Sequence, residues 1–467
     1  MRNIVLGVLV LVACTKPNPN VCCTDEADCT TKGIPVGSQC EEGLLCRGNQ
    51  CIAQPCSSSA SCDSAAPYCV ADSCAESCTE DAQCPGFSQA AEQRFCESAA
   101  CVACRVDVPA DCVDSAPVCD QGRCRTCQAH AECSSGVCAS DGTCAAENSI
   151  AYVEAGGAAT SECTRASPCS TIVRALAILP TRSYILIGSG TYAADSTITF
   201  KGTRALIGRG PTKPIVSRTT AGPIFTFGLS TDALFQNLQI SGATSSGTEY
   251  GIGILCDGHN GTAMVRLRDT TVTQNASNAL QLPACSFDIT NSVVTDNGGG
   301  LYHQDTQGTI DRSIVSGNGS GIEIDGGVYV VTNNIITRNR GNGINLFSAS
   351  PNNRVEFNTI VDNSGANTYG FTCQVQGASA SFPNNIIARN TLQTIAMNCT
   401  FPNSIIADTN ISSLAFRSPD VQPYDYHLTA GSVAIDAASV STLGQDYDGQ
   451  ARPNGNGRDV GADEFYP

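Results

Sequence analysis

Residues 291–339 read NSVVTDNGGGLYHQDTQGTIDRSIVSGNGSGIEIDGGVYVVTNNIITRN, and this stretch decides the fold. Its segments SVVTDN, SIVSGN and NIITRN each place two β-branched residues shortly before an asparagine. The pattern continues on both sides, and the asparagine returns at intervals of 22, 21, 21, 24 and 27 residues. The six positions are Asn275, Asn297, Asn318, Asn339, Asn363 and Asn390. A period of this size that contains only strand and turn residues predicts a β-solenoid.

The composition limits the class of protein. The chain has 467 residues, a net charge of -17 and a pI near 4.6, which argues against nucleic-acid or anionic-surface partners. It contains 29 cysteines, and the two C-x-x-C spacings, at Cys101/Cys104 and Cys124/Cys127, fall between cysteine modules and do not form paired zinc knuckles. We therefore expect disulfides and an exported protein, and we predict no metal in the cysteine-rich part.

The N-terminus predicts export and lipidation. Arg2 precedes an apolar run at residues 4–12, which is too short to span a bilayer but suits a signal peptide. The run ends in Leu-Val-Ala-Cys14, which resembles the lipobox of bacterial lipoproteins. That resemblance implies a signal peptide at 1–13, acylation of Cys14, a tether at 14–21 and anchoring in the outer membrane or at the cell surface. Acylation of Cys14 would also leave an even number of cysteines, 28 of the 29.

Residues 22–147 form a cysteine-rich region of five short modules, each with four regularly spaced cysteines. The sets are Cys23/29/46/51, Cys56/62/69/74, Cys78/84/96/101, Cys104/112/119/124 and Cys127/133/138/144. Cys22 and Cys40 are additional in the first module and are expected to form disulfides within it. Modules this small need disulfides to fold, and four cysteines allow three connectivities. The array resembles cysteine-rich repeats of secreted myxobacterial proteins, and either a stalk or a protein-binding module fits it.

Residues 148–410 carry the solenoid. Ser170-Thr171 is an N-cap signal for a helix at 172–179, which we expect to cover the N-terminal end of the solenoid. The pattern PCSTIVRALAILP…ILIGSGTY…ALIGRG resembles the opening of pectin-lyase-like proteins. That resemblance implies an all-β fold, a right-handed parallel β-helix, here preceded by small disulfide-rich modules.

Three cysteine pairs are expected to form disulfides in this region. Cys163 and Cys169 lie close enough to close the loop between them. The other two pairs are Cys256 with Cys285 and Cys373 with Cys399. Cys373 and Cys399 follow the repeat asparagine by ten and nine residues, so they would stack on adjacent coils. Stacked strands lie about 4.8 Å apart, within reach of a disulfide.

Residues 411–467 form a separate C-terminal capping segment. The stretches LTAGSVAID, DYDGQARP and DVGADE resemble the choice-of-anchor Q domain. Asp446, Asp448 and Gly449 resemble part of a calcium loop, but its third ligand and closing glutamate are absent. A structural turn is the favoured interpretation of Asp446 and Asp448, and no cofactor is predicted, with calcium as the alternative.

Strand alternation predicts a polar strip on the solenoid flank. The inward positions are expected at Leu280/Leu282, Leu301/His303, Ile322/Ile324, Ile344/Leu346 and Phe371/Cys373. The outward positions give a candidate ligand strip, hereafter the strip, of Tyr302, Gln304, Glu323, Asp325, Asn345 and Phe347. The alternative is a solvated face without a ligand.

No enzyme signature is complete. Gln304-Asp305-Thr306 matches only a fragment of the pectin methylesterase motif, and no lysine follows Lys213. Catalytic residues are not assigned, and an enzyme is less favoured than a binding protein. We therefore expect a lipid-anchored cell-surface protein whose flank binds polysaccharide or a surface partner. The alternatives are a polysaccharide lyase or glycoside hydrolase, and a purely structural envelope protein.

Overall fold

The computed structural model describes residues 22–23, 26–32, 44–47, 50–53, 59, 62, 68–70, 73–84, 94–106, 108–113, 115–178, 182–227, 230–257, 262–283, 285–375, 379–407 and 411–467. The chain forms two compact units, Met1–Ala145 and Ala146–Pro467, and each is described by itself. The predicted signal peptide and Cys14 lie outside the described residues. Within the described ranges, no helix is long and apolar enough to cross a membrane.

The first unit is built from short disulfide-bonded hairpins. After α1 (Glu26–Lys32) come the antiparallel pairs β1 (Leu44–Arg47) with β2 (Gln50–Ala53), β3 (Tyr68–Val70) with β4 (Ser73–Ala75), β5 (Phe95–Glu97) with β6 (Ala100–Val102), and β7 (Val118–Asp120) with β8 (Arg123–Arg125). Short 3-10 turns lie at Asp81–Gln83, Pro109–Asp111 and His130–Glu132. Each hairpin places the third and fourth cysteines of a module opposite each other.

The structure selects one connectivity in the last three modules, where the first cysteine bonds the third and the second bonds the fourth. These disulfides are Cys78–Cys96, Cys84–Cys101, Cys104–Cys119, Cys112–Cys124, Cys127–Cys138 and Cys133–Cys144. The first module differs, since Cys22 bonds Cys46 and Cys23 bonds Cys29. Cys40 lies outside the described residues.

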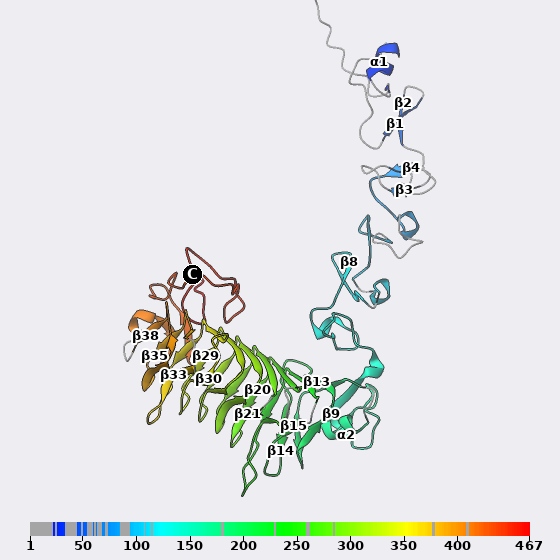
Figure 1. Cartoon of the computed structure of the whole chain (residues 1–467). Coiled ribbons are helices and arrows are strands. Elements are labelled where there is room, and N and C mark those ends of the chain that lie inside the picture. The colour runs from blue at the N-terminus through cyan, green and yellow to red at the C-terminus, as the bar shows by residue number, and fades with distance from the viewer. Residues whose placement is uncertain are drawn as a thin grey trace, which may run out of the picture. The chain divides into compact units, whose positions relative to one another are not determined.

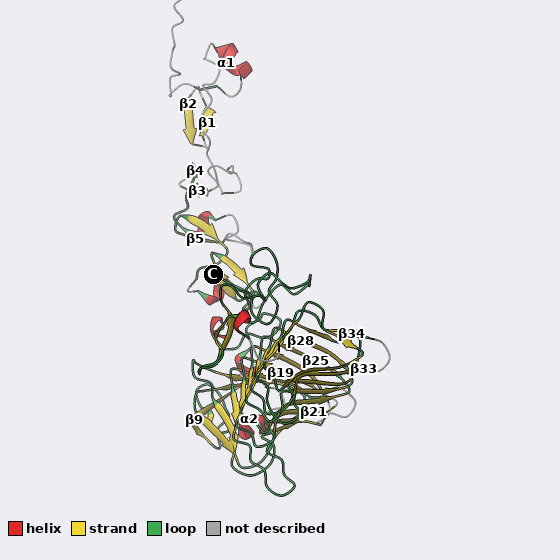
Figure 2. Ribbon diagram, turned by 90° about the vertical axis from the view of Figure 1, so that its left-hand side faces the viewer, coloured by secondary structure: helices red, strands yellow, loops and turns green. Residues whose placement is uncertain are grey.

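The second unit is the solenoid, whose strands form three parallel sheets (Figures 1 and 2). Sheet 1 contains β9 (Ile150–Ala158), β10 (Tyr184–Ile187), β13 (Thr203–Gly208), β16 (Asp232–Gln236), β19 (Met264–Arg268), β22 (Ser286–Thr290), β25 (Gln307–Asp311), β28 (Val328–Thr332) and β31 (Arg354–Glu356). Sheet 2 contains β11 (Thr191–Ala194), β14 (Ile215–Arg218), β17 (Gln239–Ser241), β20 (Thr271–Thr273), β23 (Val293–Thr295), β26 (Ile314–Ser316), β29 (Ile335–Thr337), β32 (Thr359–Val361), β35 (Ile386–Ala388) and β38 (Ile405–Ala407). Sheet 3 contains β12 (Ile198–Phe200), β15 (Phe225–Phe227), β18 (Ile254–Cys256), β21 (Asn278–Pro283), β24 (Gly299–Gln304), β27 (Ile322–Asp325), β30 (Ile344–Ala349), β33 (Tyr369–Val375) and β36 (Leu392–Met397). The predicted all-β solenoid is confirmed.

The repeat asparagines form a buried ladder at the turn after sheet 2. Asp296 has a positive φ of 56°, and this left-handed residue turns the chain so that Asn297 points inward. The backbone N–H and the Nδ2 of Asn297 both donate to Oδ1 of Asn318, at 3.0 and 2.9 Å. Asn297 Nδ2 also donates to the Val272 carbonyl of the preceding coil, at 3.0 Å. Repeated along the coils, these bonds satisfy buried backbone groups and set the period of the sequence.

A second polar ladder runs along the turn between sheets 1 and 2. Asn334 and Asn358 are fully buried, and the backbone N–H of Asn334 donates to Asn358 Oδ1 at 3.1 Å. Asn358 repeats the bond to Asn385 Oδ1 at 3.0 Å. Earlier coils use Ser292 and Ser313 at the same position. Both corners of the coil are thus fixed by side-chain amides or hydroxyls.

The N-terminal end of the solenoid is covered by α2 (Ile172–Ala177). The hydroxyl of Thr171 accepts the backbone N–H of Arg174, which caps the helix. The buried face of α2, which includes Ile172 and Ala175, packs toward β9 and β12, the first strands of sheets 1 and 3. Cys163 and Cys169, just before this helix, are disulfide-bonded.

The two remaining cysteine pairs join neighbouring coils. Cys256 is bonded to Cys285 with a Cα–Cα distance of 6.2 Å. Cys373 is bonded to Cys399 with a Cα–Cα distance of 6.3 Å. All ten side chains that alternation placed inward, from Leu280 to Cys373, are buried. Strand alternation therefore holds throughout the middle coils.

Among the described residues, the solenoid interior contains one histidine, His303, packed against the rings of Phe287 and Tyr329. His303 is fully buried, and its Nδ1 lies 3.0 Å from the Tyr329 hydroxyl. Its Nε2 lies 2.6 Å from the Cys285 carbonyl and 2.7 Å from the Thr306 hydroxyl. Burial disfavours the charged imidazolium and lowers the pKa of His303 to about 4.

We expect His303 to make the solenoid sensitive to mild acid. In the unfolded chain its pKa returns to about 6.5, so below that pH the unfolded state binds more protons than the folded state. Stability should therefore fall from about pH 6.5 to pH 4, by up to about 1.4 kcal/mol per pH unit from this group. Urea unfolding of wild type and His303→Gln across this range measures the difference. If the free energy of unfolding falls equally with decreasing pH in both proteins, His303 is not the source of the acid sensitivity.

The C-terminal segment, residues 411–467, packs along the side of the solenoid. A 3-10 turn at Ser412–Leu414 leads into the antiparallel pair β39 (Phe416–Ser418) and β40 (Asp425–Leu428). Leu414, Phe416, Leu428 and other side chains of the segment form a second apolar core with the outer face of sheet 2, including Ile335. The segment appears in orange to red beside the last coils in Figure 1. Its assignment as a choice-of-anchor Q domain stays a prediction.

Candidate functional site

The predicted strip lies on the outer face of sheet 3. Its first column stacks Tyr302, Glu323 and Asn345 in register on β24, β27 and β30. Its second column stacks Gln304, Asp325 and Phe347 on the same three strands. The structure thus brings all six predicted residues together on one surface, two side chains per coil.

Exposure along the strip is uneven. Phe347 is 40% exposed, and Tyr302, Gln304, Glu323 and Asp325 are intermediate. Asn345 is only 6% exposed, so the prediction that it forms part of an exposed face is wrong for this residue. Simple alternation gives the direction of a side chain but not how deeply its neighbours enclose it.

Two buried polar atoms at one end of the strip lack hydrogen bonds. Asn345 Oδ1 and the hydroxyl oxygen of Thr372, its neighbour in register on β33, have no partner among the described residues. Thr372 is also only 6% exposed. A buried polar group without a partner costs roughly 1–3 kcal/mol, so a pair of them indicates a place that a polar ligand or water completes.

A second candidate site is a cleft between sheet 2 and the C-terminal segment. It has a volume of about 600 Å³. One wall is the outer face of β23, β26 and β29, and the other is residues 422–427 with Tyr447. The Arg338 guanidinium lies 3.4 Å over the ring of Tyr424 at this cleft. Aromatic rings and charged groups line the cleft together.

Sequence reasoning missed the cleft because it did not place the C-terminal segment against sheet 2. One signal was present in the repeats. The later coils carry an apolar residue where an outward position needs a polar one, as at Ile335, Ile386 and Ile405. An apolar outer face predicts a covering element.

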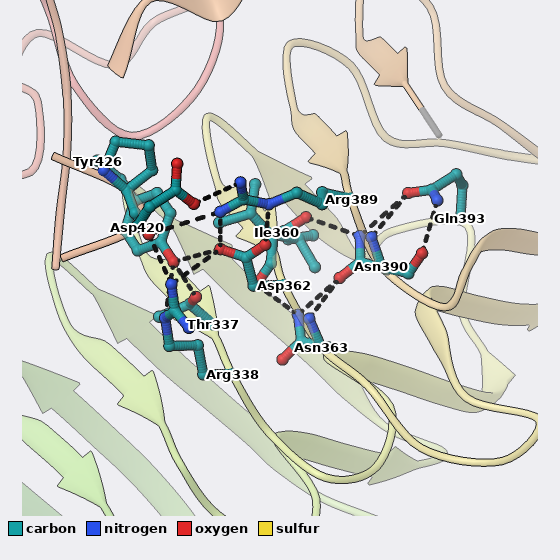
Figure 3. Close-up of polar contacts among 12 residues, drawn as sticks. Thr337, Arg338, Ile360, Asp362, Asn363, Arg389, Asn390, Gln393, Asp420 and Tyr426 are labelled. Carbon is teal, nitrogen blue, oxygen red and sulfur yellow. Dashed lines mark hydrogen bonds and ion pairs between the residues drawn. The ribbon is translucent and has the colours of Figure 1, made fainter. Parts of the chain in front are cut away.

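A polar network fixes one wall of the cleft (Figure 3). The Tyr426 hydroxyl donates to Asp362 Oδ2 at 2.5 Å and accepts from the Thr337 hydroxyl at 2.9 Å. Arg389 forms a two-point ion pair with Asp362 and reaches Asp420 of the C-terminal segment at 2.6 Å. Because Asp362 is nearly buried, this network ties the segment to the turns of the solenoid at a defined position.

A group of ionisable side chains surrounds His427 at the edge of the cleft. His427 Nδ1 is hydrogen-bonded to Asp425, and its Nε2 lies 2.9 Å from Asp448 Oδ2. Burial opposes the charge on His427, but the bond to Asp425 and the neighbouring carboxylates outweigh it and raise its pKa. Burial raises the pKa of Asp463 to about 7.

The two calcium candidates fall in different environments. Asp446 is fully buried, and its two oxygens accept the backbone N–H groups of Gln450 and Glu464, at 2.7 and 3.1 Å. Asp446 therefore holds the turn, as the favoured sequence interpretation has it. The Asp448 side chain is 39% exposed and faces His427.

A family model and one solved structure support the β-helix fold. A family model described as a right-handed beta helix region matches residues 280–417. Among solved structures, pectate lyase Pel9A is similar with a TM-score of 0.50 and 17% identity, covering 68% of this chain and 96% of that chain. A rhamnogalacturonan lyase has a TM-score of 0.38 and 12% identity, covering 58% of this chain and 91% of that chain. DFA-IIIase from Arthrobacter chlorophenolicus A6, in complex with GF2, has a TM-score of 0.29 and 11% identity, covering 68% and 98%. No curated protein matches the sequence.

Proposed function

We propose that this right-handed parallel β-helix is the ligand-binding part of an exported, lipid-anchored surface protein, and that its strip binds polysaccharide. The observation that carries the proposal is the pair of unpartnered buried oxygens on Asn345 and Thr372. They lie in one column with Glu323 and Tyr302. Both oxygens are closed to solvent, so the two side chains must rotate outward to meet a ligand; a sugar hydroxyl can then donate to Asn345 Oδ1 and accept from the Thr372 hydroxyl, which satisfies both atoms.

The rest of the strip suits an extended sugar chain. The rings of Phe347 and Tyr302 offer apolar surface for a sugar face, and the carboxylates of Glu323 and Asp325 accept hydroxyl hydrogen bonds. The residues of the strip repeat from coil to coil at the strand spacing of about 4.8 Å, so one glycan can contact several coils. The net charge of -17 disfavours an anionic chain, and we therefore propose an uncharged polysaccharide.

Replacing Asn345 by leucine should separate binding from stability. The substitution removes a buried carbonyl oxygen that has no partner, so the free energy of unfolding should stay the same or rise. Glycan affinity should fall about tenfold, because the loss of one hydrogen bond costs about 1.4 kcal/mol of binding free energy. A glycan-array screen of the soluble protein supplies the ligand, and calorimetric titration measures the affinity.

The controls test whether the strip acts as a site. Asn352→Leu changes an exposed asparagine outside the strip and should leave affinity unchanged. Tyr302→Ala and Glu323→Gln should weaken binding while altering stability by no more than about 0.5 kcal/mol. Glycan affinity that is unchanged in the Tyr302, Glu323 and Asn345 variants would leave the strip as solvated surface. Release of reducing ends or unsaturated products from the bound glycan would turn the proposal toward the enzyme alternative.

Lipid anchoring is the other half of the proposal and is tested separately. Cys14→Ser should move the protein from the membrane fraction to the soluble fraction. Each buried CH₂ of an acyl chain contributes about 0.8 kcal/mol to membrane binding, so losing the chains removes the anchor. Fractionation after a carbonate wash measures the distribution. A variant that still sediments with membranes would show that Cys14 is not the anchor.

A further inference from the structure

Three potential metal-binding side chains meet at the edge of the cleft, outside the strip. They are His427 on β40, Asp448 in the turn after Asp446, and Asp463 near the end of the chain. One donor atom from each lies within 4.8 Å of the other two. The set combines an imidazole with two carboxylates from three separate segments, a donor combination that transition metals accept.

The orientation of His427 leaves its outer nitrogen ready to bind a cation. Asp425 holds Nδ1 from one side and also accepts the backbone N–H of His427, at 3.0 Å. With the proton on Nδ1, the lone pair of Nε2 faces Asp448 Oδ2 at 2.9 Å. Two lone pairs at this distance repel each other unless a proton lies between them or a metal ion bridges both atoms from one side. A carboxylate behind a histidine is also the usual second-shell support of a metal ligand.

Asp463 completes the set from the buried side. The residue is only 6% exposed, and its Oδ2 accepts the backbone N–H of Leu428 at 2.6 Å. Hydrogen bonds from described residues reach only this oxygen, and the other is not among the enclosed unpartnered atoms, which leaves it accessible to a ligand. A buried carboxylate normally has a positive partner or a fully bonded environment.

The cleft supplies the access that such a site needs. His427 and Asp425 line its 600 Å³ volume together with Tyr447. A cation held by His427 therefore lies at the margin of an open, aromatic-lined cavity. Tetrahedral sites with three protein ligands leave the fourth position for water or substrate.

We propose that His427, Asp448 and Asp463 bind a divalent transition metal of the zinc class at this cleft. A nitrogen donor with two carboxylates suits Zn²⁺ at about 2.0–2.2 Å, whereas Ca²⁺ takes six to eight oxygen ligands at about 2.3–2.6 Å. The site is independent of the strip, on sheet 3, because the cleft is formed by sheet 2 and the C-terminal segment.

Metal titration of the full, disulfide-intact protein tests the proposal. After EDTA treatment, ZnCl₂ should bind with a stoichiometry of one in calorimetry. At about 100-fold above the dissociation constant, it should raise the Tm by several degrees. CaCl₂ at the same concentration should give a much smaller shift. His427→Gln and Asp448→Asn should each lower zinc affinity at least tenfold.

Asp296→Asn is the matched control, because Asp296 lines the same cleft and is not part of the donor set. This variant should retain zinc binding. Asp448 is 39% exposed, so Asp448→Asn keeps the test valid if His427→Gln fails to fold. Absence of a zinc-dependent Tm shift in the wild type would overturn the proposal and leave a shared proton between His427 and Asp448. Equal zinc binding in wild type and Asp448→Asn would overturn it as well.

Discussion

Replacing Arg452 by alanine is expected to destabilise the C-terminal segment by about 3–5 kcal/mol, the usual cost of removing one partner of a buried ion pair. Arg452 and Glu464 are both fully buried in their side chains and lie 3.0 Å apart. Arg452 also donates to the carbonyls of Asp459 and Gly461, at 3.0 and 2.9 Å, and lies over the ring of Phe357. Alanine would leave the Glu464 carboxylate buried without its cation.

The destabilisation caused by Arg452→Ala should appear first as local opening of residues 411–467. Limited proteolysis should cut this segment at lower denaturant concentration than the solenoid. Arg417→Ala removes an exposed arginine whose pair with Asp425 spans 3.5 Å, and it should change little. Arg452→Met combined with Glu464→Gln should recover part of the loss, since neither side chain then carries an unpaired charge. Equal protease resistance in wild type and Arg452→Ala would contradict this account.

Replacing Asn318 by leucine should cost the solenoid at least about 3 kcal/mol, because several buried groups lose partners at once and each costs roughly 1–3 kcal/mol. Asn318 Oδ1 accepts both the backbone N–H and the Nδ2 of Asn297. Its Nδ2 donates to the carbonyl of Val294 at 2.9 Å and to Asn339 Oδ1 at 3.1 Å. The substitution would interrupt the ladder in its middle.

Urea unfolding followed by circular dichroism measures this loss. The control Asn352→Leu makes the same substitution in an exposed loop. Its free energy of unfolding should remain within about 0.5 kcal/mol of that of the wild type. If Asn318→Leu changes the free energy of unfolding as little as Asn352→Leu does, the asparagine ladder does not stabilise the coils.

The coil register could be predicted because it repeats. The period of the asparagines reflects one structural requirement, a buried amide at each turn, so the sequence shows it six times. The bond between Cys373 and Cys399 on neighbouring coils follows from the same count, but the expected stacking is wrong, since Cys373 lies in register with Ala396 and Cys399 comes three residues later. Strand alternation counted from the small residue that follows each asparagine predicts the inward side chains, and all ten are buried.

The candidate sites were harder to predict because they depend on contacts that do not repeat. The burial of Asn345 and Thr372 depends on their enclosure by neighbours, which alternation does not describe. The cleft exists only because residues 411–467 pack against Ile335 and the other apolar outer positions of sheet 2. His427, Asp448 and Asp463 meet only once that segment is folded.

The most direct test of the proposed function is a crystal structure of the protein with an oligosaccharide from the glycan screen. The proposal predicts sugar density along β24, β27 and β30, with a hydroxyl within hydrogen-bond distance of Asn345 Oδ1 and a ring face on Phe347. Sugar bound only in the cleft beside Tyr424, or no sugar on sheet 3 at saturating concentration, would contradict it.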